Sequence, residues 1–341
     1  MVFVRGRRNE LLVRAREGRT MAQVNGGWSD VKWEDWQDAD NIRRRLDQGA
    51  DPEAWGGGRP LHRAAAFGSP EVVAELARRV RDVDALDDGT TALWEAVMGD
   101  RPDNARALAA AGADPWRPQL GGWSPGRLSL AGPAPDLFPV PEGGRGLTEA
   151  ERTMAREGRR LVEALGTFHY EGTGLACVAG IDAQEAMRRL EAKPADGEDL
   201  EELLDDPYAY DMDESLQTIG VTTVPGGCVV TQPWGYAPQM PGVMTMLSAG
   251  TYCYGLYANP KSGNQGIIAR DGVIEGSDLH PGGGPDHGDT SEEVLFSYLF
   301  QHNAVAYSCA RAGLRLTDTR AVIGPPDVWV ELPRRDYWKY S

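Results

Sequence analysis

Residues 58–76 read GRPLHRAAAFGSPEVVAEL, and this stretch decides the fold of the first part of the chain. The alanines at 64 and 65 are small enough to let two short helices pack closely against each other. Ser69–Leu76 then supplies the second helix, because serine and proline commonly open helices. The stretch therefore predicts a short helical hairpin.

The hairpin recurs at a regular interval along the chain. Two sets of equivalent positions show it: Asp51, Asp82 and Asp114 in the turns, then Pro60, Ala92 and Pro125 at the helix starts. The first set is separated by 31 and 32 residues and the second by 32 and 33. One such unit cannot bury its own apolar face, so the units must stack.

The motif Arg59-Pro60-Leu61-His62 and the period resemble ankyrin repeats, whose period is about 33 residues. The resemblance extends over Trp28–Trp123. It implies an α-solenoid, placed at residues 22–130, that binds other proteins and has no catalytic residues. It also implies a structural role for His62, as a hydrogen-bonding residue between repeats.

Both ends of this repeat region depart from the pattern. Trp28, Trp33 and Trp36 stand where the first unit should have its first helix, which predicts an atypical cap. Leu128 and Leu130 are expected in a closing helix. Residues 1–21 are basic but lack the apolar core of a signal peptide, so we expect a disordered extension, and Met21 is an alternative start.

Three tryptophans fall near the loops between repeats: Trp55, Trp116 and Trp123. A solenoid presents its binding edge there, and aromatic side chains are enriched among interface residues that dominate affinity. They are candidate partner-binding residues. The alternative is that they pack within the loops.

The second half of the chain predicts a different architecture. Residues 131–146, AGPAPDLFPVPEGGRG, form a linker or ordered tether rich in proline and glycine. Residues 147–341 combine helix-capping sequences with β-rich stretches, which predicts an α+β domain with a mainly antiparallel sheet. Expected helices begin after Thr148, Asp182 and Thr290, the last running as one helix towards Arg311.

Six strands are expected from runs of β-forming residues. They are Leu175–Ala179, Gly220–Val224, Cys228–Thr231, Thr251–Tyr257, Gly266–Ala269 and Val273–Ile274.

Four stretches of this half are similar to an uncharacterised family that is widespread in actinobacteria: LACVAGIDAQEAMRRLEA, GCVVTQPWGY, MLSAGTYCYGLYANP and IIARDGVIEG. That family has no established activity to carry over. Its members are associated with bacterial conflict, such as toxin immunity. The resemblance therefore implies a bacterial protein with an immunity or inhibitor role.

An acidic insertion at residues 194–216 departs from that family. No lysine or arginine occurs from Pro194 to Pro260, and the ten carboxylates in this span all lie between Asp196 and Glu214. Such a patch would steer a basic partner, as in an inhibitor that mimics nucleic acid. A solvated loop is the alternative. The candidate partner-binding residues are Glu201, Glu202, Asp205, Asp206, Tyr208, Tyr210 and Asp211.

A second cluster combines histidine with aspartate in DLHPGGGPDHGD, residues 278–289. These residue types ligate zinc and other divalent ions, although the loop offers no helix to position them. The candidate ligands are His280, Asp286, His287 and Asp289. They support the alternative function, a metal-dependent enzyme. The basic tail LPRRDYWKYS is expected either to dock on the acidic insertion or the domain's own surface, or to fray.

Composition narrows the class of protein. A net charge of −16 disfavours nucleic acid and anionic membranes as partners. The four cysteines are far apart and lie in apolar stretches, so we expect buried thiols in a reducing cytoplasm. No cofactor is predicted, and the oligomeric state is not determined by the sequence. The leading hypothesis is a non-enzymatic, acidic, cytoplasmic protein-binding module.

Overall fold

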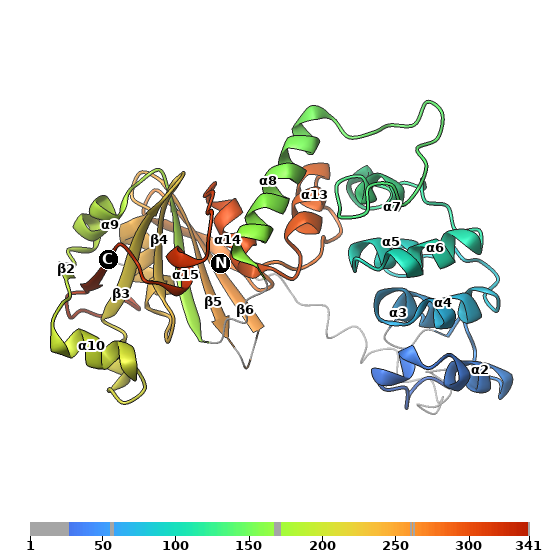
Figure 1. Cartoon of the computed structure of the whole chain (residues 1–341), viewed down its shortest axis with the longest axis horizontal. Helices are drawn as coiled ribbons and strands as arrows, with labels where there is room; N and C mark the ends of the chain where they lie inside the picture. Colours follow the sequence, from blue (N-terminus) through green and yellow to red (C-terminus); the bar gives the residue numbers. More distant parts are fainter. Residues whose placement is uncertain (1–26, 55–57, 167–171, 260, 262, 340–341) are drawn as a thin grey trace. The chain divides into compact units, whose positions relative to one another are not determined.

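Two units make up the chain in this computed structural model, which describes residues 27–54, 58–166, 172–259, 261 and 263–339 (Figure 1). Unit 1 is the chain up to Thr148 together with Asp286–Val294, and unit 2 is the remainder. The predicted extension at residues 1–21 lies outside the described residues. The predicted tether at 131–146 stays a prediction, although Phe138 within it is buried.

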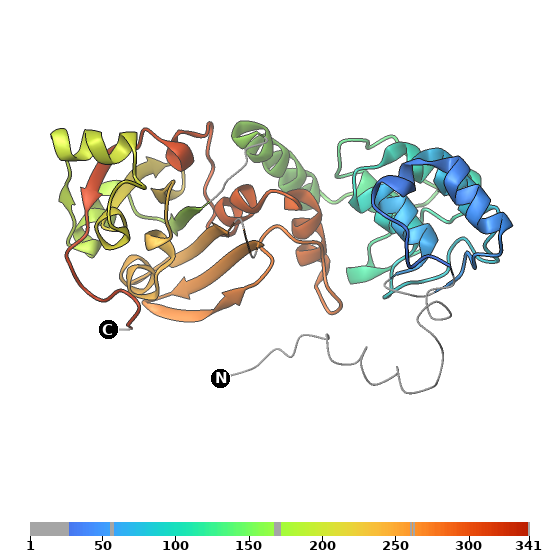
Figure 2. The same cartoon turned by 90° about the horizontal axis from the view of Figure 1, so that it is seen from below.

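Unit 1 is a stack of helical hairpins, and Figure 2 looks along that stack. Its helices are η3 (Glu34–Gln37), α2 (Ala39–Asp47), α3 (Pro60–Phe67), α4 (Pro70–Ala77), α5 (Ala92–Met98), α6 (Pro102–Ala110), η4 (Leu120–Gly122) and α7 (Pro125–Ser129). Side-chain caps start several of them, because a hydroxyl oxygen can accept an otherwise unpaired backbone N–H. Ser69 caps α4, Thr91 caps α5 and Ser124 caps α7.

The two ends of the stack are closed as the sequence predicts. A single 3₁₀ turn, η3, replaces the first helix of the first unit, and it buries Trp36 under the stacked ring of Trp28 at 5.8 Å. At the other end α7 is one short helix with Leu128 fully buried. Each end thereby covers the apolar face that a terminal repeat would otherwise expose.

Unit 2 is built around an eight-stranded sheet in which every neighbouring pair is antiparallel, in the order β2-β8-β3-β4-β1-β5-β6-β7. The strands are β1 (Thr173–Ala179), β2 (Lys193–Pro194), β3 (Thr218–Val224), β4 (Gly227–Gln232), β5 (Tyr252–Asn259), β6 (Gly263–Arg270), β7 (Val273–Asp278) and β8 (Val328–Glu331). The helices are α8 (Glu149–Leu165), α9 (Ala183–Leu190), α10 (Glu198–Asp205), α11 (Met212–Ser215), η5 (Ala237–Gln239), α12 (Pro241–Leu247), α13 (Ser291–Phe300), α14 (Ala304–Arg311) and α15 (Arg320–Ile323).

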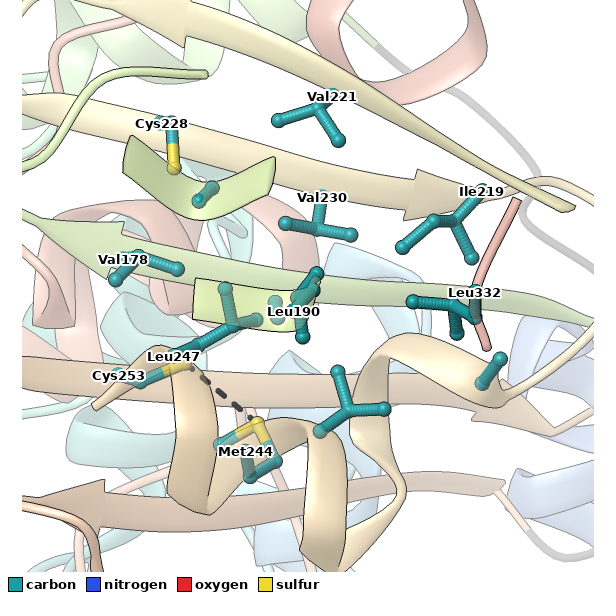
Figure 3. Packing of buried hydrophobic residues seen from close by; sticks show 14 of the residues in the cluster. Val178, Leu190, Ile219, Val221, Cys228, Val230, Met244, Leu247, Cys253 and Leu332 are labelled. Atoms are coloured by element: carbon teal, nitrogen blue, oxygen red, sulfur yellow. Dashed lines mark hydrogen bonds between the residues drawn. The ribbon is translucent and has the colours of Figure 1, made fainter. Parts of the chain in front are cut away.

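Helices cover both faces of the sheet, so its central strand β1 is buried along nearly its whole length. Alternate residues of a strand point to opposite faces. Ala176 and Val178 therefore join a core with α9 and α12, in which Leu190, Met244 and Leu247 are fully buried (Figure 3). Leu175 and Cys177 join a second core with α8 and α14. All four cysteines are buried free thiols, as predicted.

The α+β fold and the mainly antiparallel sheet are confirmed, but three details of the prediction are wrong. Strands β2 and β8 were not expected from the sequence. The helix expected to run from Thr290 towards Arg311 is broken into α13 and α14, because His302 adopts a left-handed φ of 63° and Asn303 caps a new helix. Within the described residues, no helix combines the length and apolarity needed to cross a bilayer.

Candidate protein-binding surfaces

The loops that join one repeat to the next are here called fingers: the first lies at residues 48–59, of which 55–57 are not described, the second at 78–91 and the third at 111–124. The second finger forms a tight hairpin turn. In the second finger, Asp88 and Gly89 take positive φ values of 47° and 83°. This is the conformation that a two-residue hairpin turn requires and that an Asp-Gly pair adopts most readily. Asp87 and Thr90 close the turn with reciprocal backbone hydrogen bonds of 2.9 and 3.1 Å. The Asp-Gly sequence thus accounts for the tight turn of the second finger.

Neighbouring fingers are joined by side-chain hydrogen bonds that repeat at the same sequence interval. The Asp87 carboxylate accepts the N–H of Arg59 at 2.7 Å, and the Gln119 side-chain oxygen accepts the N–H of Thr91 at 2.8 Å. Both pairs are 28 residues apart. The second finger is therefore bonded to the described part of the first finger and to the third finger.

His62 has the structural role that the resemblance implied. Its Nε2 atom lies 3.0 Å from the carbonyl oxygen of Thr90 in the next repeat, so the ring must donate from that nitrogen. Burial lowers the pKa of His62, because the imidazolium form is poorly solvated there. The residue joins two repeats as a neutral donor.

The three tryptophans predicted on the binding edge have different environments. Trp55 lies outside the described residues. Trp116 is half-buried, and its ring packs against the backbone of Gly126 at the start of α7. Trp123 is fully buried, with the guanidinium of Arg127 stacked over its ring at 3.9 Å. The prediction of Trp123 as an exposed binding residue is wrong, because its own chain covers it.

The segment that meets Trp123 is Asp286–Val294, which belongs to unit 1. Trp123 Nε1 donates a 2.7 Å hydrogen bond to the carbonyl oxygen of Ser291. A Cβ atom on Gly121 would lie 2.8 Å from the Val294 side chain, so the missing side chain leaves room for the segment. The third finger is therefore in direct contact with a segment 168 residues further along the chain.

The same segment also contacts the second finger. His287 Nε2 lies 3.1 Å from an Asp88 carboxylate oxygen. The imidazole sits over Gly89, where an added Cβ atom would be closer than any real contact allows. Two groups of residues that the sequence suggested for separate purposes, a partner-binding edge and a metal site, thus bind each other.

The predicted metal site is not assembled. No group of three histidine, cysteine or acidic residues among the described residues has the geometry to hold a metal ion. His287 is directed at Asp88, whereas the Asp289 carboxylate accepts the N–H of Asp286 and the His280 N–H bonds to Asp278. The four predicted ligands serve loop and finger contacts instead of converging on one point.

An exposed aromatic pair, not predicted from the sequence, lies at the N-terminal end of the stack. The rings of Trp33 and Phe67 are 4.3 Å apart, yet their residues are 62% and 38% exposed. Aromatic side chains left in water beside a repeat surface are common anchors for partners. The pair joins η3 to the end of α3, a contact between elements that spacing alone does not reveal.

The acidic insertion is an ordered part of unit 2. It contains α10, whose residue Leu203 is buried, and the short helix α11. Its end is attached to the sheet through the Ser215 carbonyl oxygen, which accepts from Gln232 Nε2 and Trp234 Nε1, both at 3.1 Å. The following carboxylates are all exposed: Asp196, Glu198, Asp199, Glu201, Glu202, Asp205, Asp206, Asp211 and Glu214.

Aromatic side chains accompany these carboxylates. Tyr208 is 76% exposed, and the Tyr210 hydroxyl donates to Glu202 at 3.3 Å. Burial and the neighbouring Glu202 carboxylate raise the pKa of Tyr210. Trp234, held by Ser215, stacks with Trp329 of β8 at 5.5 Å. A surface that combines carboxylates with aromatic rings can contact both the charge and the flat face of a guanidinium group.

The basic C-terminal tail lies on unit 2. The N–H of Gly242 donates to the Tyr337 carbonyl oxygen at 2.7 Å, and Tyr337 is buried. Arg335 pairs with Glu191 at 2.7 Å, and Arg334 approaches Glu214 of the insertion to 4.0 Å. Of the alternatives considered from the sequence, docking on the domain's own surface is confirmed.

Comparison with known families assigns the first unit. Residues 37–119 match the family model for ankyrin repeats, in three copies. Residues 37–119 of this chain are ankyrin repeats. Such repeats bind other proteins as a class, so protein partners in general are expected of unit 1. No curated protein matches the chain. The likeness of its second half to an actinobacterial family stays a prediction.

Proposed function

We propose that this chain is a non-enzymatic binding protein that recruits a basic protein partner through its acidic insertion. The observation that carries the proposal is the density of exposed carboxylates at 194–216, with no lysine or arginine as far as Pro260. Such a surface attracts cationic proteins over about 10 Å at moderate ionic strength. It also repels nucleic acid.

The chemistry of the surroundings supports a protein partner over a simple counter-ion. Five of the carboxylates lie in α10, and all of them are in one segment with the exposed ring of Tyr208. Aromatic rings beside carboxylates favour arginine, which can stack and form paired hydrogen bonds. An arginine-bearing surface, such as that of a nuclease blocked by an immunity-type inhibitor, has the required chemistry.

The predicted alternative, a metal-dependent enzyme centred on His280, Asp286 and His287, is not proposed. Its ligand set is dispersed, and His287 is engaged by a finger of unit 1. The ankyrin repeats instead add a second protein-binding surface to the same chain.

The test is a charge-neutral variant of the full chain, E201Q/E202Q/D205N/D206N, used as bait in lysate of the host organism. The matched control, E71Q/D136N/E142Q/E163Q, removes the same charge from exposed carboxylates elsewhere. We expect a basic protein to be retained by the wild type and the control and lost by the insertion variant. Retention should also weaken with added salt, because surface charge interactions are screened.

Two results would oppose the proposal. Equal retention of the same partner by both variants would move the binding site away from the insertion, with the ankyrin edge as the next surface to test. Equal loss from both variants would show that only the total charge matters and that the position of the carboxylates does not.

A further inference from the structure

Residues Asp286–Val294 occupy the finger edge in the manner of a bound peptide. The segment touches the second finger through His287 and the third through Ser291 and Val294. It belongs to unit 1 although the chain on both sides of it belongs to unit 2. The segment therefore covers part of two neighbouring fingers.

The fingers are shaped to receive this segment. Gly89 and Gly121 are the two positions where a side chain would collide with it, whereas Gly112 and Gly122 have positive φ values but nothing within 4 Å. The positive φ values are enough to explain glycine at all four positions. At Gly89 and Gly121 the missing side chain also leaves the space that the segment fills. The buried Trp123 indole adds a directed donor.

The segment is itself held in the shape that the fingers contact. The Asp286 N–H donates to Asp289 at 2.9 Å. Thr290 and Glu293 form a reciprocal capping box, in which the Thr290 N–H donates at 2.8 Å and the Glu293 N–H at 3.3 Å. A preorganised turn followed by a capped helix start loses little conformational freedom on binding.

We propose that Asp286–Val294 is an internal ligand of the ankyrin finger edge, and that it keeps outside proteins from the second and third fingers until it is released. The proposal is independent of the acidic insertion. The ligand has a defined chemistry. The His287 imidazole lies over Gly89, and the Ser291 carbonyl at the start of α13 accepts the Trp123 indole N–H.

The first experiment tests whether the space at Gly121 is needed for the segment to bind the third finger. Amide hydrogen exchange of residues 286–294 is measured by mass spectrometry in the full chain and in Gly121→Val. The matched control is Gly122→Val, which has the same backbone demand without a collision. We expect exchange in the segment to rise at least about tenfold in the first variant, or about 1.4 kcal/mol of lost protection, and to stay unchanged in the second.

The second experiment asks whether the released edge binds a ligand. A fluorescent peptide DHGDTSEEV, residues 286–294, is titrated into the wild type and into H287A/G288V, which weakens the segment without altering the fingers. We expect the variant to bind the peptide at least about tenfold more tightly, because the internal competitor is lost. Adding Gly121→Val to that variant should abolish binding.

Unchanged exchange in Gly121→Val, or equal peptide affinity in the wild type and H287A/G288V, would overturn the proposal. If Gly121→Val fails to fold, Gly89→Ala with Gly112→Ala as its control poses the same question at the second finger. Loss of peptide binding leaves the acidic insertion unaffected, so the two proposals fail separately.

Discussion

The two units solve the problem of burial in different ways. In unit 1, neighbouring repeats are joined by buried polar groups: His62 bonds to the Thr90 carbonyl, and the Asn104 side-chain amide donates to the carbonyl oxygens of Ala64, Ala65 and Gly68. In unit 2, two apolar cores on either side of β1 carry the packing. Unit 1 also buries apolar side chains, among them Leu76, Leu93 and Leu108, so what distinguishes it is the set of directional polar bonds that join its repeats.

Both candidate surfaces include polar bonds to a backbone carbonyl oxygen. In unit 1 the Trp123 indole donates to the Ser291 carbonyl beside the contact of His287 with Asp88, and in unit 2 the Ser215 carbonyl accepts from Gln232 and Trp234. The difference lies in coverage, because the insertion is exposed whereas two fingers are occupied.

The largest expected effect is a loss of stability in unit 2. Leu175→Ala in β1 removes a fully buried side chain from the core shared with α8 and α14. We expect the free energy of unfolding of unit 2 to fall by about 2–5 kcal/mol, as lost burial and a residual cavity add. Urea unfolding measures it. The control Leu279→Ala, at a 69% exposed leucine of the same unit, should change little.

The intermediate effect is in the repeat unit. Asn104→Ala removes an amide that is 3% exposed and takes a hydrogen-bond donor from the buried carbonyl oxygens of Ala65 and Gly68, whereas the Ala64 carbonyl keeps its bond from the Gly68 N–H. We expect a loss of about 2 kcal/mol from the stability of unit 1. Asp103→Ala, one residue earlier and paired only at the surface with Arg106, is the control. Equal losses from the two variants would contradict the importance assigned to buried polar bonds.

The smallest effect is a dependence on pH. The pKa of His62 is lowered by burial, so between its folded and unfolded pKa values the unfolded chain binds a proton that the folded chain lacks. Stability is therefore full above pH 6.5 and falls as pH decreases below it, by at most about 1.4 kcal/mol per pH unit. Glu95, whose pKa is raised mainly by burial, acts in the opposite sense, since its folded form gains the proton first.

His62→Gln separates the two contributions, because glutamine can still donate to the Thr90 carbonyl but does not titrate. Free energies of unfolding of the wild type and the variant are measured between about pH 7.5 and pH 5. The stability difference between them should shrink or reverse as the pH falls, as the wild type alone loses stability through His62. Parallel curves would show that His62 has the same pKa folded and unfolded.

The sequence by itself determined the repeat hairpins, the helix caps and six of the strands. These features depend on residues within one helix, turn or strand: Ser69 caps the helix it precedes, and the continuous apolar run around Cys177 predicts a buried strand. The turn at Arg270–Gly272 joins adjacent strands for the same reason. Local backbone geometry depends on neighbouring residues, so residue type and spacing are sufficient to predict it.

Only the tertiary structure decided strand order, the pairing of β8 with β3, and which surfaces are open. Trp123 and Ser291 are 168 residues apart, and Asp88 and His287 are 199 apart. No periodicity links such residues, because their contact depends on how complete elements pack. For that reason the sequence suggested a binding edge and a separate metal site, whereas in the folded chain the two segments contact each other.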